Sequence, residues 1–115
     1  MDVSYEELRE SVQANRGLRT VAMGTLRDIE GAGRLGIQVR DAISRSLESH
    51  GMGHFPAELP PNQHDQVRLY LLGTSIAEVI KAVLNPSLKG DESLRGIGDA
   101  GAHEQLRQIR EIVGG

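Results

Sequence analysis

The glycines of residues 31–36, in the sequence GAGRLG, have the spacing that a dinucleotide-binding turn requires. Such a turn follows a strand and precedes a helix. It also needs an acidic residue ~20 positions further on, whose carboxylate binds the ribose of the cofactor. The segment before Gly31 has a helical period instead, and the acidic residue closest to that distance, Glu48, falls within the next predicted helix. We therefore expect no cofactor. The glycines suit a helix-turn-helix whose second helix offers free amides to a phosphate, and a tight turn without a ligand explains them equally.

His50 and His54 are four positions apart, which would place both imidazoles on one face of a continuous helix. Gly51 and Gly53 lie between them, where the helix is expected to end, and the chain contains no cysteine. No ligand set typical of zinc remains, so we expect no metal. The sequence also has no nucleophile elbow and no recognisable carboxylate pair, and we expect no enzymatic activity.

The composition describes one small domain with an aliphatic core. The chain has 115 residues, and because only 3% of them are aromatic its core must consist of Leu, Ile, Val, Ala and Met. No stretch reaches the ~20 consecutive apolar residues of a membrane span, and the acidic start MDVSYEELRE does not resemble a signal peptide. The absence of cysteine agrees with a reducing compartment. We expect a cytoplasmic protein.

Charge is distributed unevenly along the chain. The net charge is −3, which argues against avid nucleic-acid binding, yet residues 16–46 contain six arginines and three acidic residues, a local balance of +3. Arginine outnumbers lysine eleven to two, and its planar guanidinium suits phosphates, base edges and carboxylates. A GC-rich codon bias would produce the same ratio. The charge pattern therefore allows a nucleic-acid partner or an acidic protein partner.

Three helices are predicted in the first 51 residues. The first begins with a capping box formed by Ser4 and Glu7. The second covers residues 17–31 and ends at Gly31, and the third follows the GAGRLG turn and ends near Gly51. The apolar face of the second helix consists of Leu18, Ala22, Leu26 and Ile29. The third helix has an apolar stripe of Val39, Ala42, Ile43 and Leu47, and an opposite face of Gln38, Asp41, Ser44, Arg45 and Glu48.

A β-hairpin and a fourth helix are predicted next. Residues 52–55 and 67–72 are expected to pair, because the second segment alternates apolar and polar residues, and the proline-containing segment between them forms an irregular tip. The fourth helix begins with another capping box, Ser75 and Glu78, and stops at Pro86. We expect one core shared by the strand and this helix, with Leu71, Val79, Ile80 and Val83 in it.

The remaining residues are predicted to form a linker and a terminal helix. Residues 86–101 contain four glycines and little periodicity, so we expect a Gly-rich linker between a domain over residues 1–85 and an amphipathic helix over 102–115. The apolar seam of that helix must pack against another apolar surface. The spacing fits both the domain's own core and a second copy of the chain. We predict a homodimer with Leu106, Ile109 and Val113 at its interface.

The order of elements over residues 4–72 resembles the winged helix-turn-helix class of DNA-binding domains, a mainly α fold with a small β-hairpin. The resemblance implies that the third predicted helix recognises double-stranded DNA and that the hairpin tip is the wing. The DNA-binding residues it implies are Arg34, Gln38, Arg40, Asp41 and Arg45 in the turn and helix, with His64 and Arg68 around the wing. Asp41, Glu48 and the acidic tip PAELPPNQHD depart from the basic surface typical of the class.

Two functions follow from this pattern. The first is a cytoplasmic DNA-binding module, such as a bacterial transcription or defence-system regulator. The alternative is a protein-interaction or oligomerisation domain that binds no nucleic acid. Charge distinguishes them, because a coherent positive surface favours DNA and a mosaic of signs favours a protein partner.

Overall fold

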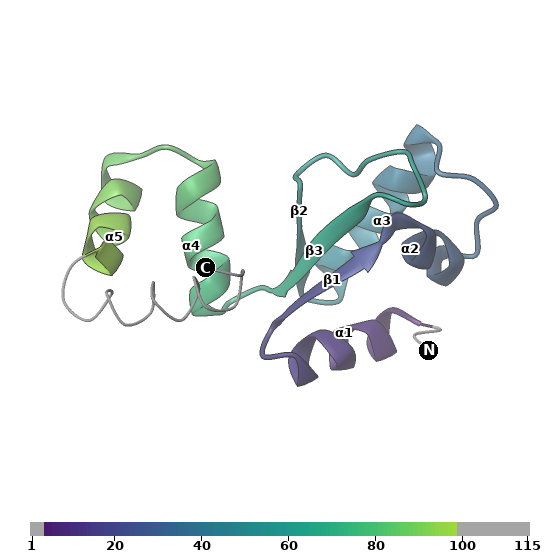
Figure 1. The fold of residues 1–115 in the computed structure, drawn as a ribbon, viewed down its shortest axis with the longest axis horizontal. Coiled ribbons are helices and arrows are strands. Elements are labelled where there is room, and N and C mark those ends of the chain that lie inside the picture. Colours follow the sequence, from purple (N-terminus) through teal and green to yellow (C-terminus); the bar gives the residue numbers. More distant parts are fainter. Residues whose placement is uncertain (1–3, 99–115) are drawn as a thin grey trace. The chain divides into compact units, whose positions relative to one another are not determined.

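The computed structural model of the chain describes residues 4–98 and falls into two compact units, Met1–Ala77 and Glu78–Gly115 (Figure 1). We call them the N-terminal unit and the C-terminal unit. The N-terminal unit contains α1 (Tyr5–Ala14), β1 (Leu18–Ala22), α2 (Met23–Glu30), α3 (Ile37–Ser49), β2 (Met52–Phe55) and β3 (Gln66–Leu71). Helix α4 (Ser75–Leu84) begins at the end of this unit, and α5 (Leu88–Gly98) follows it.

The three strands found in residues 4–98 form one antiparallel sheet in the order β1-β3-β2. The predicted hairpin of β2 and β3 is confirmed, and Met52 pairs with Leu71 at its open end. Strand β1 pairs along the other edge of β3, where Val21 lies opposite Val67. With five helices over the same residues, the fold is mixed α/β rather than mainly α.

The prediction of one helix over residues 17–31 was wrong in its first half. Residues 18–22 form β1, and only Met23–Glu30 form α2. The chain turns sharply before the strand, because Arg16 and Gly17 both have positive φ angles, 62° and 84°. Thr20 and Val21 are β-branched and favour a strand, and in it Val21 is buried while Thr20 is exposed. The predicted stop at Gly31 is confirmed by its left-handed conformation.

The other predicted helices form with small changes at their ends. The side chain of Ser4 caps α1 by accepting a hydrogen bond from the Glu7 amide. Helix α3 has the predicted stripe, with Ile43 and Leu47 fully buried. The residue that caps α4 is Thr74, whose Oγ1 accepts from the Ala77 amide at 3.2 Å, and not Ser75 as the capping box predicted.

The core of the N-terminal unit is aliphatic, as the composition predicted. It fills the space between one face of the sheet and the helices α1, α2 and α3 (Figure 1). Its buried residues are Leu8, Val12, Val21, Met23, Leu26, Ile43, Leu47, Met52, Leu59, Val67 and Leu69. Burial of such side chains is the main stabilising contribution to a domain of this size.

Leu71 packs at the margin of this core. Val79, Ile80 and Val83 belong to the C-terminal unit, so the core that they were predicted to share with Leu71 stays a prediction. Residues 88–98, which were expected to lie in the Gly-rich linker, form α5. Gly90 and Gly96 lie within this helix and weaken its sequence signal. The predicted terminal helix over 102–115 lies outside the described residues.

Candidate nucleic-acid interface

The turn between α2 and α3 leaves the start of α3 open. Gly31 ends α2 at φ 78° and ψ 21°, and the Ala32 amide donates to the Arg27 carbonyl at 3.1 Å. Gly36 is the N-cap of α3, and no side chain caps the helix there. The first amides of α3 therefore carry the partial positive charge of an uncapped helix start. Arg34 lies exposed in the turn beside them.

The outward face of α3 carries polar and charged side chains that the fold itself does not use. Gln38, Asp41 and Arg45 are exposed, and neither Arg34 nor Arg45 has a hydrogen-bond or ion-pair partner among residues 4–98. Ile37 at the start of the helix is 71% exposed, which the sequence analysis did not single out. The signal in the sequence for this exposure was the position of Ile37 directly after Gly36, at the end of the turn. The structure brings these residues together on one side of α3.

Arg40 has a different position from the other predicted DNA contacts. Its side chain is half-buried, and Nε donates to the Leu35 carbonyl at 3.1 Å while Nη1 donates to the Leu59 carbonyl at 3.0 Å. Two of its five N–H donors are thus used inside the protein. Arg40 ties the turn before α3 to the loop after β2, and spacing alone could not reveal this role.

The loop of residues 56–65 folds back on the helices instead of projecting freely. Leu59 is buried in the core at 4% exposure. At the return of the loop, the carbonyl of Gln63 accepts from the Gly24 amide at 2.9 Å and that of Asp65 accepts from the Met23 amide at 2.8 Å. These bonds satisfy the first amides of α2, which no side chain caps. A Cβ at Gly24 would lie 3.3 Å from the Gln63 oxygen, so a glycine here permits the close approach.

Ser44 and His54 join α3 to β2 through an ordered polar contact. Ser44 Oγ and His54 Nε2 are 2.8 Å apart, and His54 Nδ1 lies 2.8 Å from the Pro56 carbonyl oxygen. A carbonyl only accepts, so Nδ1 carries the proton and in the neutral ring Nε2 accepts from the serine hydroxyl. Both side chains line a half-open hollow of about 440 Å³ with Arg40 and Glu58. The sequence indicated His54 only as a possible metal ligand, and no local signal pointed to its contact with Ser44.

His50 also has a partner other than a metal. Its ring stacks on Tyr5 with centroids 5.4 Å apart, and Nδ1 lies 2.7 Å from the Ser46 carbonyl oxygen. Tyr5 in turn donates a 2.6 Å hydrogen bond to Glu30, and burial together with this carboxylate raises the pKa of Tyr5 well above its usual 10.0. Within residues 4–98 no three histidine, aspartate or glutamate side chains are placed to hold a metal ion.

The two predicted wing residues lie apart from each other. His64 is exposed in the loop, and its amide donates to Asn62 Oδ1 at 2.8 Å, which fixes the turn there. Arg68 lies on the sheet face opposite the core, where its cross-strand partners are Thr20 and Phe55. Because α3 packs on the core face, the structure does not bring Arg68 together with the exposed side of α3.

The predicted dimer residues Leu106, Ile109 and Val113 lie outside the described part of the chain. None of the helices in residues 4–98 has the length and apolar character needed to cross a membrane.

Comparisons of this chain with protein families, curated proteins and solved structures gave no match.

Proposed function

We propose that the N-terminal unit is a winged helix-turn-helix module that binds double-stranded DNA through α3. The order α1-β1-α2-α3-β2-β3 supports this proposal, because a strand between the first two helices is paired with the last strand of a hairpin. In a helix-turn-helix the second helix of the motif lies in the major groove, and α3 has that place in this order of elements. Transcriptional control and a defence system are both biological settings in which such a module would act.

The observation that carries the proposal is the unused polar face of α3 beside its open N-terminus. Arg34 and the first amides of the helix would bind backbone phosphates, which position the helix without reading sequence. Gln38 has the donor and acceptor that adenine requires, Arg45 suits the O6 and N7 atoms of guanine, and Asp41 accepts from the cytosine amino group. The exposed Ile37 adds an apolar contact for a thymine methyl.

Arg40 and the loop of residues 56–65 would hold the residues of this surface in position. The two carbonyl contacts of Arg40 fix the turn and the loop relative to α3, so that Arg34 is presented next to the helix. The remaining donors of the guanidinium stay available to a phosphate. His64 in the loop is exposed and would make a wing contact to the backbone. Arg68 would contribute only if the DNA also reached the outer sheet face.

Fluorescence anisotropy on a panel of labelled duplexes tests the proposal. Each phosphate that an arginine neutralises adds about −0.9 to the slope of log affinity against log salt. Arg34 and Arg40 would therefore give a slope of about −2, and Arg45 would bring it to about −3 if it contacts a phosphate and not a base. Replacing Arg45 by alanine is expected to cost about 1 to 3 kcal/mol on the preferred sequence if the side chain contacts a guanine. An equal loss on all duplexes would assign Arg45 to a phosphate.

One observation favours the alternative, a protein-interaction domain. Asp41 and Glu48 are exposed on the same helix face as Arg45, so the charges on this face alternate in sign. A mixed surface of this kind suits an oppositely patterned protein better than a uniform polyanion. Absence of binding to any duplex at about 50 mM salt, where non-specific contacts are strong, would support this alternative.

A further inference from the structure

The outer sheet face is the side of the sheet that is turned away from the core of the N-terminal unit. Helices α1, α2 and α3 pack on the other side, against buried strand residues such as Val67 and Leu69. Side chains alternate along a strand, so the residues between the buried ones point outward, and none of them is buried. The outer sheet face consists of Leu18, Thr20, Ala22, Gly53, Phe55, Gln66, Arg68 and Tyr70.

The ring of Tyr70 lies flat on this face. Tyr70 is the cross-strand partner of Gly53, and a Cβ added to the glycine would overlap the ring atoms Cε2, Cζ and Oη at nearly equal distances. A point that is this close to three bonded atoms and equally far from each lies above the ring plane and not beyond its edge. One face of the ring therefore covers the glycine, and the other face is turned away from the sheet.

Phe55 and Arg68 form the neighbouring cross-strand pair on the same face. Phe55 is 46% exposed, and the exposed side chain of Arg68 has no hydrogen-bond or ion-pair partner among residues 4–98. Diagonal positions on adjacent strands are about 7 Å apart, so Phe55 and Tyr70 present two rings close together, with the arginine opposite one of them.

The polar residues of the outer sheet face match a ligand that is both anionic and hydroxylated. Arg68 is the one charged residue among those that form the face, so its charge is complementary to an anion. Thr20, opposite Arg68, and Gln66 are exposed and have no side-chain hydrogen bond within residues 4–98. A hydroxyl and an amide can each donate to and accept from a hydroxyl of the ligand.

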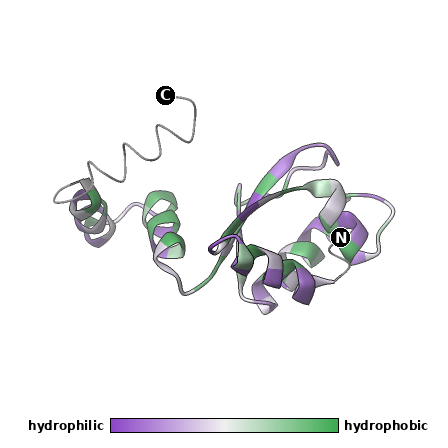
Figure 2. Ribbon diagram, turned by 60° about the horizontal axis from the view of Figure 1, so that its bottom comes forward, coloured by the Kyte–Doolittle hydropathy of each residue, from purple (hydrophilic) through white to green (hydrophobic). Residues whose placement is uncertain are grey.

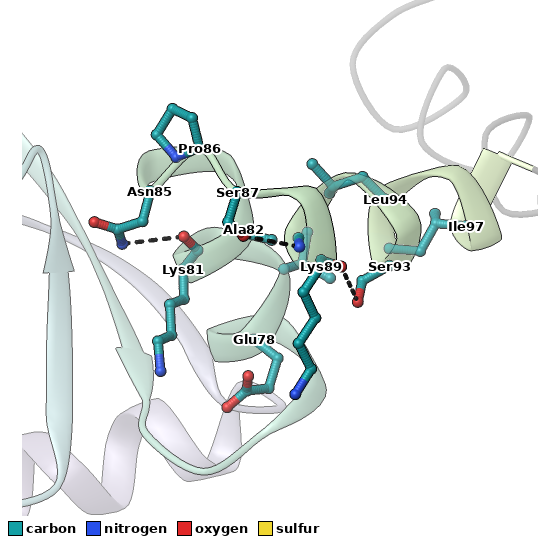
Figure 3. A pocket seen from close by; sticks show the side chains of 12 residues that line it. Glu78, Lys81, Ala82, Asn85, Pro86, Ser87, Lys89, Ser93, Leu94 and Ile97 are labelled. Atoms are coloured by element: carbon teal, nitrogen blue, oxygen red, sulfur yellow. Dashed lines mark hydrogen bonds between the residues drawn. The ribbon is translucent and has the colours of Figure 1, made fainter.

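The groove between α4 and α5 in the C-terminal unit, about 360 Å³ in volume, lacks such a pattern (Figure 3). Figure 2 shows α4 as a strongly hydrophobic helix. The polar side chains of Asn85, Ser87 and Ser93 bond to backbone groups of the unit itself, and charges of both signs, such as Glu78 and Lys81, also line the groove. Its charge therefore does not select a partner as that of the outer sheet face does.

We propose that the outer sheet face binds single-stranded RNA. Unpaired bases stack on exposed aromatic rings, so Phe55 and Tyr70 would each receive one base, while Arg68 binds a backbone phosphate. Thr20 and Gln66 would bond to a 2′-hydroxyl, the group that distinguishes RNA from DNA. The inference is independent of duplex binding by α3, because α3 packs on the opposite side of the sheet.

Fluorescence anisotropy of the full-length chain with a labelled uridine oligomer of about ten nucleotides tests the inference. Phe55→Ala is expected to weaken binding about 5- to 150-fold, because one base loses its stacking partner. Phe55→Trp keeps an aromatic ring and should retain binding. The charge-matched control is Arg9→Ala, an exposed arginine on α1.

Salt dependence separates the roles of the ring and the charge. Arg68→Ala is expected to make the slope of log affinity against log salt shallower by about 0.7, the value for one phosphate of a single strand. Phe55→Ala should lower the affinity and leave this slope unchanged, because stacking releases no counterions.

A deoxyuridine oligomer of the same length isolates the 2′-hydroxyl, and we expect it to bind about 2- to 12-fold more weakly than the uridine oligomer. Equal affinity for the two oligomers would overturn the assignment to RNA. Absence of binding, or equal losses for Phe55→Ala and Arg9→Ala, would overturn the site itself. A dimer in light scattering that Phe55→Ala dissociates would assign the face to a second copy of the chain. Circular dichroism confirms that each variant is folded.

Discussion

Nη1 of Arg40 on α3 donates a 3.0 Å hydrogen bond to the carbonyl oxygen of Leu59, whose own side chain is buried in the core. The bond fixes the loop after β2 against the proposed recognition helix. A residue predicted from its charge to contact DNA therefore has a structural task as well. This distinction between Arg40 and Arg45 yields the first prediction.

Replacing Arg40 by alanine is expected to lower the free energy of unfolding by about 1 to 3 kcal/mol, because the carbonyls of Leu35 and Leu59 lose their donor. Arg45→Ala removes the same charge from an exposed side chain that has no partner among residues 4–98, and should change stability by less than about 0.5 kcal/mol. Urea denaturation measures the free energy of unfolding of both variants. Equal stabilities would show that the Arg40 contacts do not hold the loop.

The core of the N-terminal unit can be tested within a single helix. Ile43 on α3 is fully buried, and truncation to alanine is expected to cost about 2 to 5 kcal/mol. Ile37→Ala makes the same chemical change at a position that is 71% exposed, and should cost less than about 0.5 kcal/mol. Similar losses in the two variants would mean that α3 packs with a different face toward the sheet.

Gly53 and Tyr70 form a cross-strand pair in which the tyrosine ring covers the glycine. A Cβ at position 53 would overlap the ring of Tyr70, so the ring must move in Gly53→Ala. We expect the Gly53→Ala substitution to destabilise the protein, and to cost less in a Tyr70→Ala background, with a coupling of about 0.5 kcal/mol or more for residues in contact. Additive effects in this double-mutant cycle would contradict the close approach.

Tyr5 provides a test of the contact between α1 and α2. Its pKa is raised above 10.0 by burial and by Glu30, so the unfolded chain loses the phenolic proton before the folded protein does. The stabilisation is therefore present below pH 10 and is lost progressively as the pH rises above it.

Absorbance of the tyrosinate measures this titration. The chain has two tyrosines, so in a Tyr70→Phe variant the signal comes from Tyr5 alone. We expect ionisation at a higher pH than in the same variant unfolded in urea, and a smaller difference after Glu30→Gln. Coincident titration curves in the folded and unfolded states would contradict the burial of Tyr5.

Elements with strong local signals could be predicted from the sequence, and those fixed by distant partners could not. The Ser4 cap and the Ile43 and Leu47 stripe are local, and α1 and α3 formed as expected. Strand β1 depends on pairing with β3, far along the chain, and its apolar residues at positions 18 and 22 also fit a helical spacing. Propensity alone could not decide between the two.

The candidate site was predictable to a similar extent. The exposure of Gln38, Asp41 and Arg45 follows from the period of α3, because residues opposite a buried stripe face water. The contacts of Arg40 with the loop join residues whose approach depends on the whole fold. Arg68 was placed near the wing by its order in the chain, whereas the pleat of β3 turns it to the outer sheet face.

The most direct measurement for the account is anisotropy of labelled duplexes at about 50 mM and at physiological salt, with the natural protein, Arg45→Ala and a charge-matched control, Arg9→Ala on α1. We predict binding that weakens with salt, a loss of about 1 to 3 kcal/mol for Arg45→Ala, and a much smaller loss for Arg9→Ala. Absence of binding to every duplex, or equal losses for the two arginine variants, would contradict recognition of DNA by α3.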